Sequence, residues 1–237
     1  MNRLALLSAV MVFTCSCIGD GSFSVVAEGK NVQDGFAATQ LTDGWAVGFE
    51  RFEVTFASVT VLNAKGGGLS GYAYDGANPP VDLAHPDAAE GVRLTEHMTG
   101  GEAAGEVSWQ VSPVALPGAQ LPAYFIRGNA KKASDTLGFG WRLTRDTRYS
   151  DCPIGASPHF GVLITIDAAP LFTDATGSLS FGAFAAADTN GDGEIEESEL
   201  RAAPPLDGLG TNLWETLDAR SKGMGFMSGN QPCLTVQ

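Results

Sequence analysis

The sequence predicts a mainly β protein, an antiparallel β-sandwich or partly open barrel that carries a small helical cap at its carboxyl end. Apolar residues alternate with small or polar ones over most of the chain, which is the pattern of half-buried strands. The 237 residues include 30 glycines and 12 prolines, as expected for a chain with many turns. Helical spacing of apolar residues is confined to the last third.

The clearest strand begins at Gly44, where Trp45, Val47 and Phe49 take alternate positions. The alternation resumes in the opposite phase at Phe52, which predicts a β-bulge or a bend between the two runs. Further strands are expected over residues 59–61, 107–111, 137–143 and 160–166. Turns are expected at residues 65–68, 76–80 and 127–129, where glycine, asparagine and proline gather.

Three segments of the last third have helical character. Phe181 and Phe184 lie three residues apart within an alanine-rich run, which predicts a helix. A second helix must be short, because two consecutive prolines follow it. The third can be capped by Thr211 or Asn212 and ends near Gly223. The predicted helical segments are residues 179–187, 197–203 and 213–223.

The organisation we expect has four parts. Residues 1–16 form a signal peptide, and residues 17–43 form a polar leader or tether with a strand at Ser22–Ala27. Residues 44–175 form the β domain. Residues 176–237 form the helical cap packed on the sheet.

Residues 188–199 place oxygen donors where a twelve-residue calcium loop requires them. The side chains at loop positions 1, 3, 5 and 12 are direct ligands, position 7 offers its carbonyl, and position 9 acts through water. Gly193 at position 6 permits the sharp turn. The expected ligands are Asp188, Asn190, Asp192, Glu194, Glu196 and Glu199.

This loop resembles that of EF-hand proteins, so the resemblance implies an EF-hand-like cap and Ca²⁺ as the cofactor. The likeness covers the loop and its flanks. The exit helix is short and no second loop of this kind occurs in the chain, so we expect a structural clip rather than a sensor.

The amino terminus has one arginine and then about ten apolar residues, too few to span a bilayer, as in a secretory signal peptide. The following cysteines resemble the lipobox of bacterial lipoproteins. Cys17, preceded by Ser16, is favoured over Cys15 as the lipidated residue. The expected location is therefore outside the cytoplasm, on a bacterial membrane held through lipid.

Two other residue counts bear on stability and partners. Cys152 and Cys233 remain after processing, and an even pair in an exported chain predicts a disulfide. The formal charge of −13 disfavours nucleic acid as a partner, because phosphate backbones repel it. An unidentified protein or glycan remains the expected ligand.

The chain lacks the common catalytic motifs, so we do not expect an enzyme. There is no G-x-S-x-G turn, no H-E-x-x-H and no phosphate-binding glycine loop. A histidine base would have to be His85, His97 or His159, and none has a recognisable partner in the sequence.

Two alternative functions stay open. Met224, Met227, His97 and Cys233 offer soft ligands for an exported copper-binding protein, although the methionines also suit a core. Four tryptophans, together with Tyr72 and Tyr74, suit a carbohydrate-binding module. The alternating context of Trp45, Trp109 and Trp141 predicts core positions instead.

The segments Leu41–Phe52 and Arg148–Cys152, together with the loop at 188–199, resemble an uncharacterised family of bacterial exported lipoproteins. That resemblance implies a β domain and no known activity. The sequence as a whole predicts a calcium-binding lipoprotein of the periplasm or cell surface, with a structural or ligand-binding role.

Overall fold

The computed structural model describes residues 22–63, 65–74, 76, 79–86, 91–98, 104–154, 162–227, 233 and 235–236, and of His97 only the backbone. The predicted signal peptide, Cys17 and His159 lie outside these residues. The fold is mainly β, as predicted, with three large sheets and four short helices in the described part of the chain.

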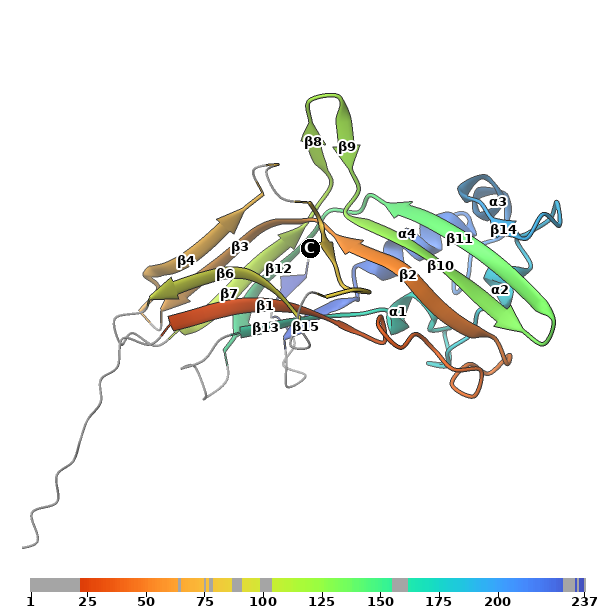
Figure 1. Cartoon of the computed structure of the whole chain (residues 1–237), viewed down its shortest axis with the longest axis horizontal. Helices are drawn as coiled ribbons and strands as arrows, with labels where there is room; N and C mark the ends of the chain where they lie inside the picture. Colours follow the sequence, from red (N-terminus) through yellow and green to blue (C-terminus); the bar gives the residue numbers. More distant parts are fainter. Residues whose placement is uncertain are drawn as a thin grey trace, which may run out of the picture.

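The strands form sheets whose order differs from their order in the chain (Figure 1). The first sheet runs β15 (Gly225–Met227), β13 (Val162–Asp167), β1 (Ser22–Lys30) and β6 (Val92–Met98). The second runs β14 (Glu194–Ile195), β11 (Asp135–Leu143), β10 (Tyr124–Lys132), β2 (Ala46–Val54) and β5 (Val81–Asp82). The third runs β16 (Thr235–Val236), β12 (Thr147–Pro153), β7 (Ala104–Val111), β3 (Phe56–Asn63) and β4 (Gly68–Ala73). A hairpin of β8 (Val114–Leu116) and β9 (Ala119–Leu121) projects from the body.

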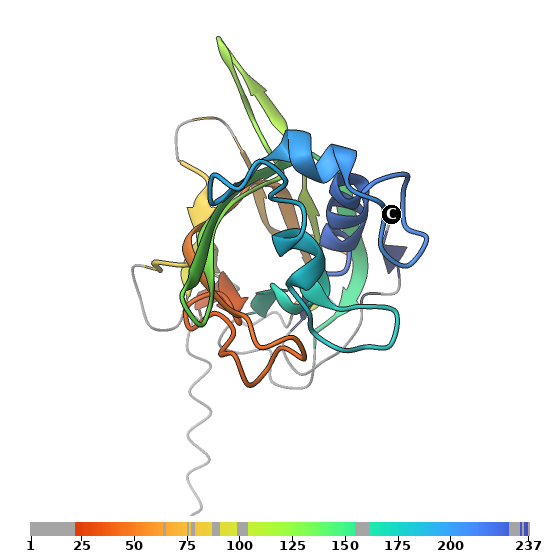
Figure 2. The same ribbon diagram turned by 90° about the vertical axis from the view of Figure 1, so that its right-hand side faces the viewer.

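The helices cover one face of the second sheet. They are α1 (Ala169–Phe172), α2 (Gly182–Ala185), α3 (Glu197–Ala202) and α4 (Leu213–Ser221). Figure 2 shows β10 and β11 curving around one side of the core with the helices across from them. Phe172, Phe181 and Phe184 of the helical part pack on Phe139 and Trp141 of β11. Aromatic burial therefore joins the cap to the sheet.

The phase slip in the first long strand is confirmed as a β-bulge. Arg127 of β10 pairs with Arg51, and the next residue, Gly128, pairs with Phe49, so Glu50 is the extra residue. The turn predicted at residues 127–129 is wrong, because these residues lie within β10. The chain reverses after Lys132 instead, where Ala133 has a φ of 52°.

The prediction that residues 17–43 form a leader does not match the structure over residues 22–30. The strand expected at Ser22–Ala27 is present, but it extends to Lys30 and lies inside the first sheet, between β13 and β6. Val25 and Ala27 are fully buried. Polar residues at alternate positions made this strand resemble a polar leader in the sequence. They occur because one face of β1 is buried and the other is partly exposed.

The boundary expected between the sheet domain and residues 176–237 is crossed by β-pairing. β15 pairs with β13, and β14 pairs with β11. The pairings of β1 with β13 and of β14 with β11 are parallel, so the sheets are not purely antiparallel as expected.

The predicted disulfide is confirmed. Cys152 of β12 is bonded to Cys233, 81 positions later in the chain. No helix in the described part of the chain has the length and apolarity needed to cross a bilayer.

Candidate metal centre and neighbouring clefts

The loop 188–199 joins a single helical turn, α2, to the short helix α3. Gly191 and Gly193 have φ angles of 71° and 84°, a region that side chains with a Cβ avoid. The helix before the loop, α2, is shorter than the predicted residues 179–187. The helix after the loop, α3, ends at Ala202, ahead of the two prolines, as expected. The backbone therefore turns at the glycine that the calcium motif requires.

The side chains of the first three ligand candidates accept hydrogen bonds from amide groups of the loop itself. Asp188 accepts hydrogen bonds from the N–H of Gly191 at 2.9 Å and of Gly193 at 3.2 Å. Asn190 Oδ1 accepts from the N–H of Asp192 at 2.8 Å. Asp192 Oδ1 accepts from the N–H of Glu194 at 2.9 Å, and its Oδ2 accepts from the Asn190 amide at 2.9 Å. These hydrogen bonds stabilise the curved backbone of the loop.

Glu199 closes the loop from α3. Its side chain is buried, with Oε1 accepting from the N–H of Thr189 at 3.0 Å and Oε2 from the N–H of Glu196 at 3.1 Å. Glu196 and Glu199 form a capping box at the start of α3. The carboxylate of Glu199 therefore accepts hydrogen bonds from backbone amides near the start and near the end of the loop.

The donor types and their order fit calcium, but the described residues show no group of three or more His, Cys, Asp or Glu side chains assembled around one point. The carboxylates of Asp188 and Glu199 face backbone amides. An ion in the loop requires these oxygens to converge, together with the carbonyl of Glu194.

The loop is fixed to the second sheet at Gly138. The N–H of Gly138 donates to the carbonyl of Gly193 at 2.7 Å, and β14 pairs with β11 through Glu194 and Ile195. The side chain of Ile195, at position 8 of the loop, is buried. A Cβ at Gly138 would collide with the Glu194 carboxylate, so the glycine leaves room for the loop.

Asp43 is a residue that the sequence analysis missed. Its Oδ2 accepts from the Ser180 hydroxyl at 2.8 Å and from the N–H groups of Phe181 and Gly182 at 2.7 and 2.5 Å. Burial raises the pKa of this carboxyl, but the bonds from Ser180 and the backbone amides outweigh burial and lower it below its usual range. No local pattern could reveal the contact, because the partners lie some 137 to 139 positions apart.

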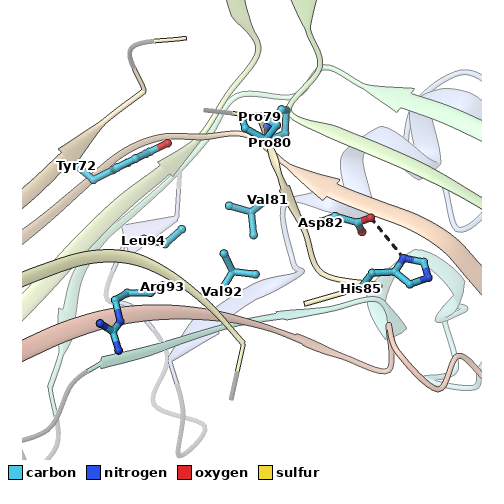
Figure 3. A pocket seen from close by; sticks show the side chains of 9 residues that line it. All are labelled: Tyr72, Pro79, Pro80, Val81, Asp82, His85, Val92, Arg93 and Leu94. Carbon is cyan, nitrogen blue, oxygen red and sulfur yellow. Dashed lines mark ion pairs between the residues drawn. The ribbon is translucent and has the colours of Figure 1, made fainter. Parts of the chain in front are cut away.

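A pocket of about 430 Å³ lies where edge strands of the three sheets meet. Figure 3 shows Val81 of β5 facing Val92 of β6, with the ring of Tyr72 from β4 on one side. The Arg93 guanidinium points away from this apolar centre. The residues that line the pocket are Tyr72, Pro79, Pro80, Val81, Asp82, His85, Val92, Arg93 and Leu94.

At one end of this pocket, His85 lies beside Asp82, with Nδ1 and Oδ2 3.5 Å apart. The other oxygen of Asp82 accepts from the N–H groups of Phe52 and Ala84, both at 3.0 Å. Asp82 is thus a fixed carboxylate beside an exposed imidazole. This histidine does have a carboxylate neighbour, which the sequence did not reveal. Among the described residues that line the pocket there is no serine, threonine, cysteine or lysine.

A second cleft of about 400 Å³ borders the loop 188–199, the candidate metal loop. One wall consists of Asp192, Gly193 and Glu194 from the loop. The rest comes from β2, β10 and β11 of the second sheet and comprises Glu50, Arg127, Gly128, Asn129, Lys131, Thr136, Gly138 and Phe139. We call this cleft the loop groove.

The residues of the two alternative functions lie mostly in the core. Met224 and Met227 are buried, and the sulfur of Cys233 is bonded to Cys152, which removes that thiolate from a copper site. All four tryptophans are buried, which confirms the core positions predicted for Trp45, Trp109 and Trp141. A carbohydrate-binding platform of exposed tryptophans is therefore not formed.

Comparison of the chain with protein-family models, with curated proteins and with solved structures found no match. The site must therefore be interpreted from its own residues.

Proposed function

We propose that the protein is an exported, lipid-anchored calcium-binding protein in which the ion at residues 188–199 clips the helical cap to the sheet. The observation that carries the proposal is the complete series of oxygen donors in a loop that turns at Gly193 and is paired to β11. Such extracellular loops bind calcium with dissociation constants on the order of 10⁻⁴ to 10⁻³ M.

Each residue has a defined part in this proposal. Asp188, Asn190 and Asp192 supply side-chain oxygens, Glu194 its carbonyl, and Glu199 both carboxylate oxygens, with Glu196 acting through water. A bound calcium ion supplies positive charge that offsets the repulsion among these carboxylates. Ile195 and the β14 pairing then transmit the order of the loop to β11.

The membrane attachment in this proposal depends on the amino terminus. A lipid on Cys17 would hold the domain at a bacterial membrane, at the periplasmic or outer surface. Mass spectrometry of the membrane fraction would give a diacylated peptide beginning at Cys17. The Cys17→Ser variant should instead be released in soluble form.

Thermal unfolding of residues 18–237 in millimolar calcium and in excess chelator tests the metal site. At one to ten times the dissociation constant, calcium adds about 0.4 to 1.4 kcal/mol, which raises Tm by about 1 to 6 °C in a domain of this size. Glu199→Gln should abolish the increase. Glu197→Gln is the matched control, since Glu197 pairs with Arg201 and is no ligand. A calcium effect of equal size in both variants would rule out the loop.

The pocket at the three sheet edges supports a second candidate function, the binding of a small apolar molecule. Pockets of this size that combine apolar walls with a few polar groups are typical ligand sites. Anilinonaphthalene sulfonate should fluoresce in it, and Tyr72→Ala should weaken this binding. Tyr74→Ala, outside the pocket, serves as the control. Equal binding by both variants would argue against the site.

A further inference from the structure

The loop groove is built from two opposed polar walls. Arg127, Asn129 and Lys131 alternate along one face of β10, and their neighbours Ile126, Gly128 and Ala130 are buried on the other face. Across the groove lie Asp192 and Glu194 of the metal loop, both exposed. Cations and carboxylates thus face each other across a cleft of about 400 Å³, which is the size of a small ligand site.

Some polar groups of the groove already have partners, and others do not. Arg127 lies 3.4 Å from Glu50, and the Asn129 amide donates to Glu50 at 3.4 Å. The side chains of Lys131 and Thr136 make no hydrogen bond or ion pair with the part of the chain that is described. The groove therefore offers an ammonium and a hydroxyl as donors, and the Asn129 and Glu194 oxygens as acceptors.

The charge of the groove depends on the metal loop. Its two cations and three carboxylates sum to one negative charge, and a calcium ion in the adjoining loop would make the sum one positive charge. Lys131 and the ion would then attract a carboxylate. The strong negative charge of the whole protein is screened beyond about 8 Å at physiological salt. The charges that line the groove therefore determine whether it attracts a carboxylate.

We infer that the loop groove binds a saccharide that carries carboxylates, that is, a chain of uronic acids. This inference rests on the proposed calcium site. The sugar carboxylate pairs with Lys131 and Arg127, and its hydroxyls, which both donate and accept, meet Asn129, Thr136 and Glu194. Among the described residues that line the groove the only aromatic ring is that of Phe139, and it is buried, so these residues offer a neutral sugar no face on which to stack.

Isothermal titration with oligogalacturonate in millimolar calcium tests this inference. Lys131→Ala should weaken binding at least about tenfold, because a hydrogen bond to a charged group is lost. Lys132→Ala is the matched control, since Lys132 is equally exposed but does not line the groove. Polyglutamate carries carboxylates without sugar hydroxyls and should bind more weakly, as should a neutral galactan.

The outcomes separate this inference from the calcium proposal. If calcium raises Tm and oligogalacturonate does not bind, the groove inference is overturned and the metal site stands. If calcium leaves Tm unchanged, the metal site is overturned. Saccharide binding that still requires Lys131 would then show that the groove recognises the sugar without the ion, and the argument from the charge of the ion would fail. Equal loss in the Lys131 and Lys132 variants, or polyglutamate binding as tightly as the saccharide, would contradict recognition in the groove.

Discussion

At the scale of single residues, Asp43 connects the amino-terminal segment to the helical cap. It accepts from the amides that begin α2, so it is the N-terminal cap of that helix although it lies far away in the chain. We expect Asp43→Ala to lower the free energy of unfolding by about 1 kcal/mol, the usual cost of a lost cap. Urea unfolding of this variant and of Asp34→Ala, which makes no such contacts, would measure the difference.

The same carboxyl gives a dependence on pH. Its folded pKa is below the value of an unfolded aspartate, so its contribution to stability is present above about pH 4 and is lost as pH falls through the folded pKa. As pH falls from about 4 to below the folded pKa of Asp43, the free energy of unfolding should decrease more for the wild type than for Asp43→Ala. Parallel unfolding curves of the two proteins down to low pH would contradict this assignment.

Two glycines of the second sheet make a matched test of packing. A Cβ on Gly128 would collide with the carbonyl of Gly48 and the ring of Phe139, whereas a Cβ on Gly140 meets nothing within 4 Å. We expect Gly128→Ala to cost about 1 to 3 kcal/mol, the range for an overpacked core. Gly140→Ala should leave Tm nearly unchanged. Chemical denaturation of both variants decides whether the bulge at Glu50 requires this close approach.

At the scale of elements, the connection between α3 and α4 is held by a buried cation. Arg220 of α4 is 8 % exposed, pairs with Asp207, and donates from Nη1 to the carbonyl of Leu171 in α1 at 3.1 Å. Asp207 has a φ of 58°, which asparagine also tolerates.

Asp207→Asn therefore removes the charge without straining the backbone. The Arg220 cation would remain buried without its partner, and we expect a loss of about 3 kcal/mol, the low end of the range because Asp207 is partly exposed. Removing the exposed pair in Glu197→Gln should cost less than about 0.5 kcal/mol. Calorimetry of the two variants compares them directly.

The elements also show how far sequence can predict this fold. The strands at residues 107–111 and 137–143 and the helix capped by Asn212 were predicted correctly, because their patterns are local. β1 was assigned to a leader because both of its partners, β6 and β13, are remote in the chain. Residues 127–129 were assigned to a turn because glycine and asparagine, typical turn residues, lie there within a strand. The candidate donors of the loop 188–199 could be named from spacing. The attachment of this loop to Gly138 and the contact of Asp43 with the start of α2 could not.

At the scale of the whole molecule, the disulfide joins Cys152 in β12 of the third sheet to Cys233, which precedes β16 of the same sheet. The strand β16 pairs with β12. Closing a loop of 81 positions stabilises the fold by about 4.5 kcal/mol in the chain-entropy model. The double variant Cys152→Ser, Cys233→Ser should lose stability of this order. Wild type measured in a reductant should match the variant, and a stable reduced protein would show that the sheet does not need the bond.

The interior position of β1 also determines the order of events during synthesis. Glu28 of β1 pairs with Thr165 of β13, which follows 137 positions later. At about 5 to 20 residues per second, the ribosome completes that partner roughly 7 to 27 s after β1 has emerged. During this interval an apolar strand has an open edge that can pair with other chains. A chaperone that holds residues 22–30 until β13 is made would keep this edge from pairing with other chains.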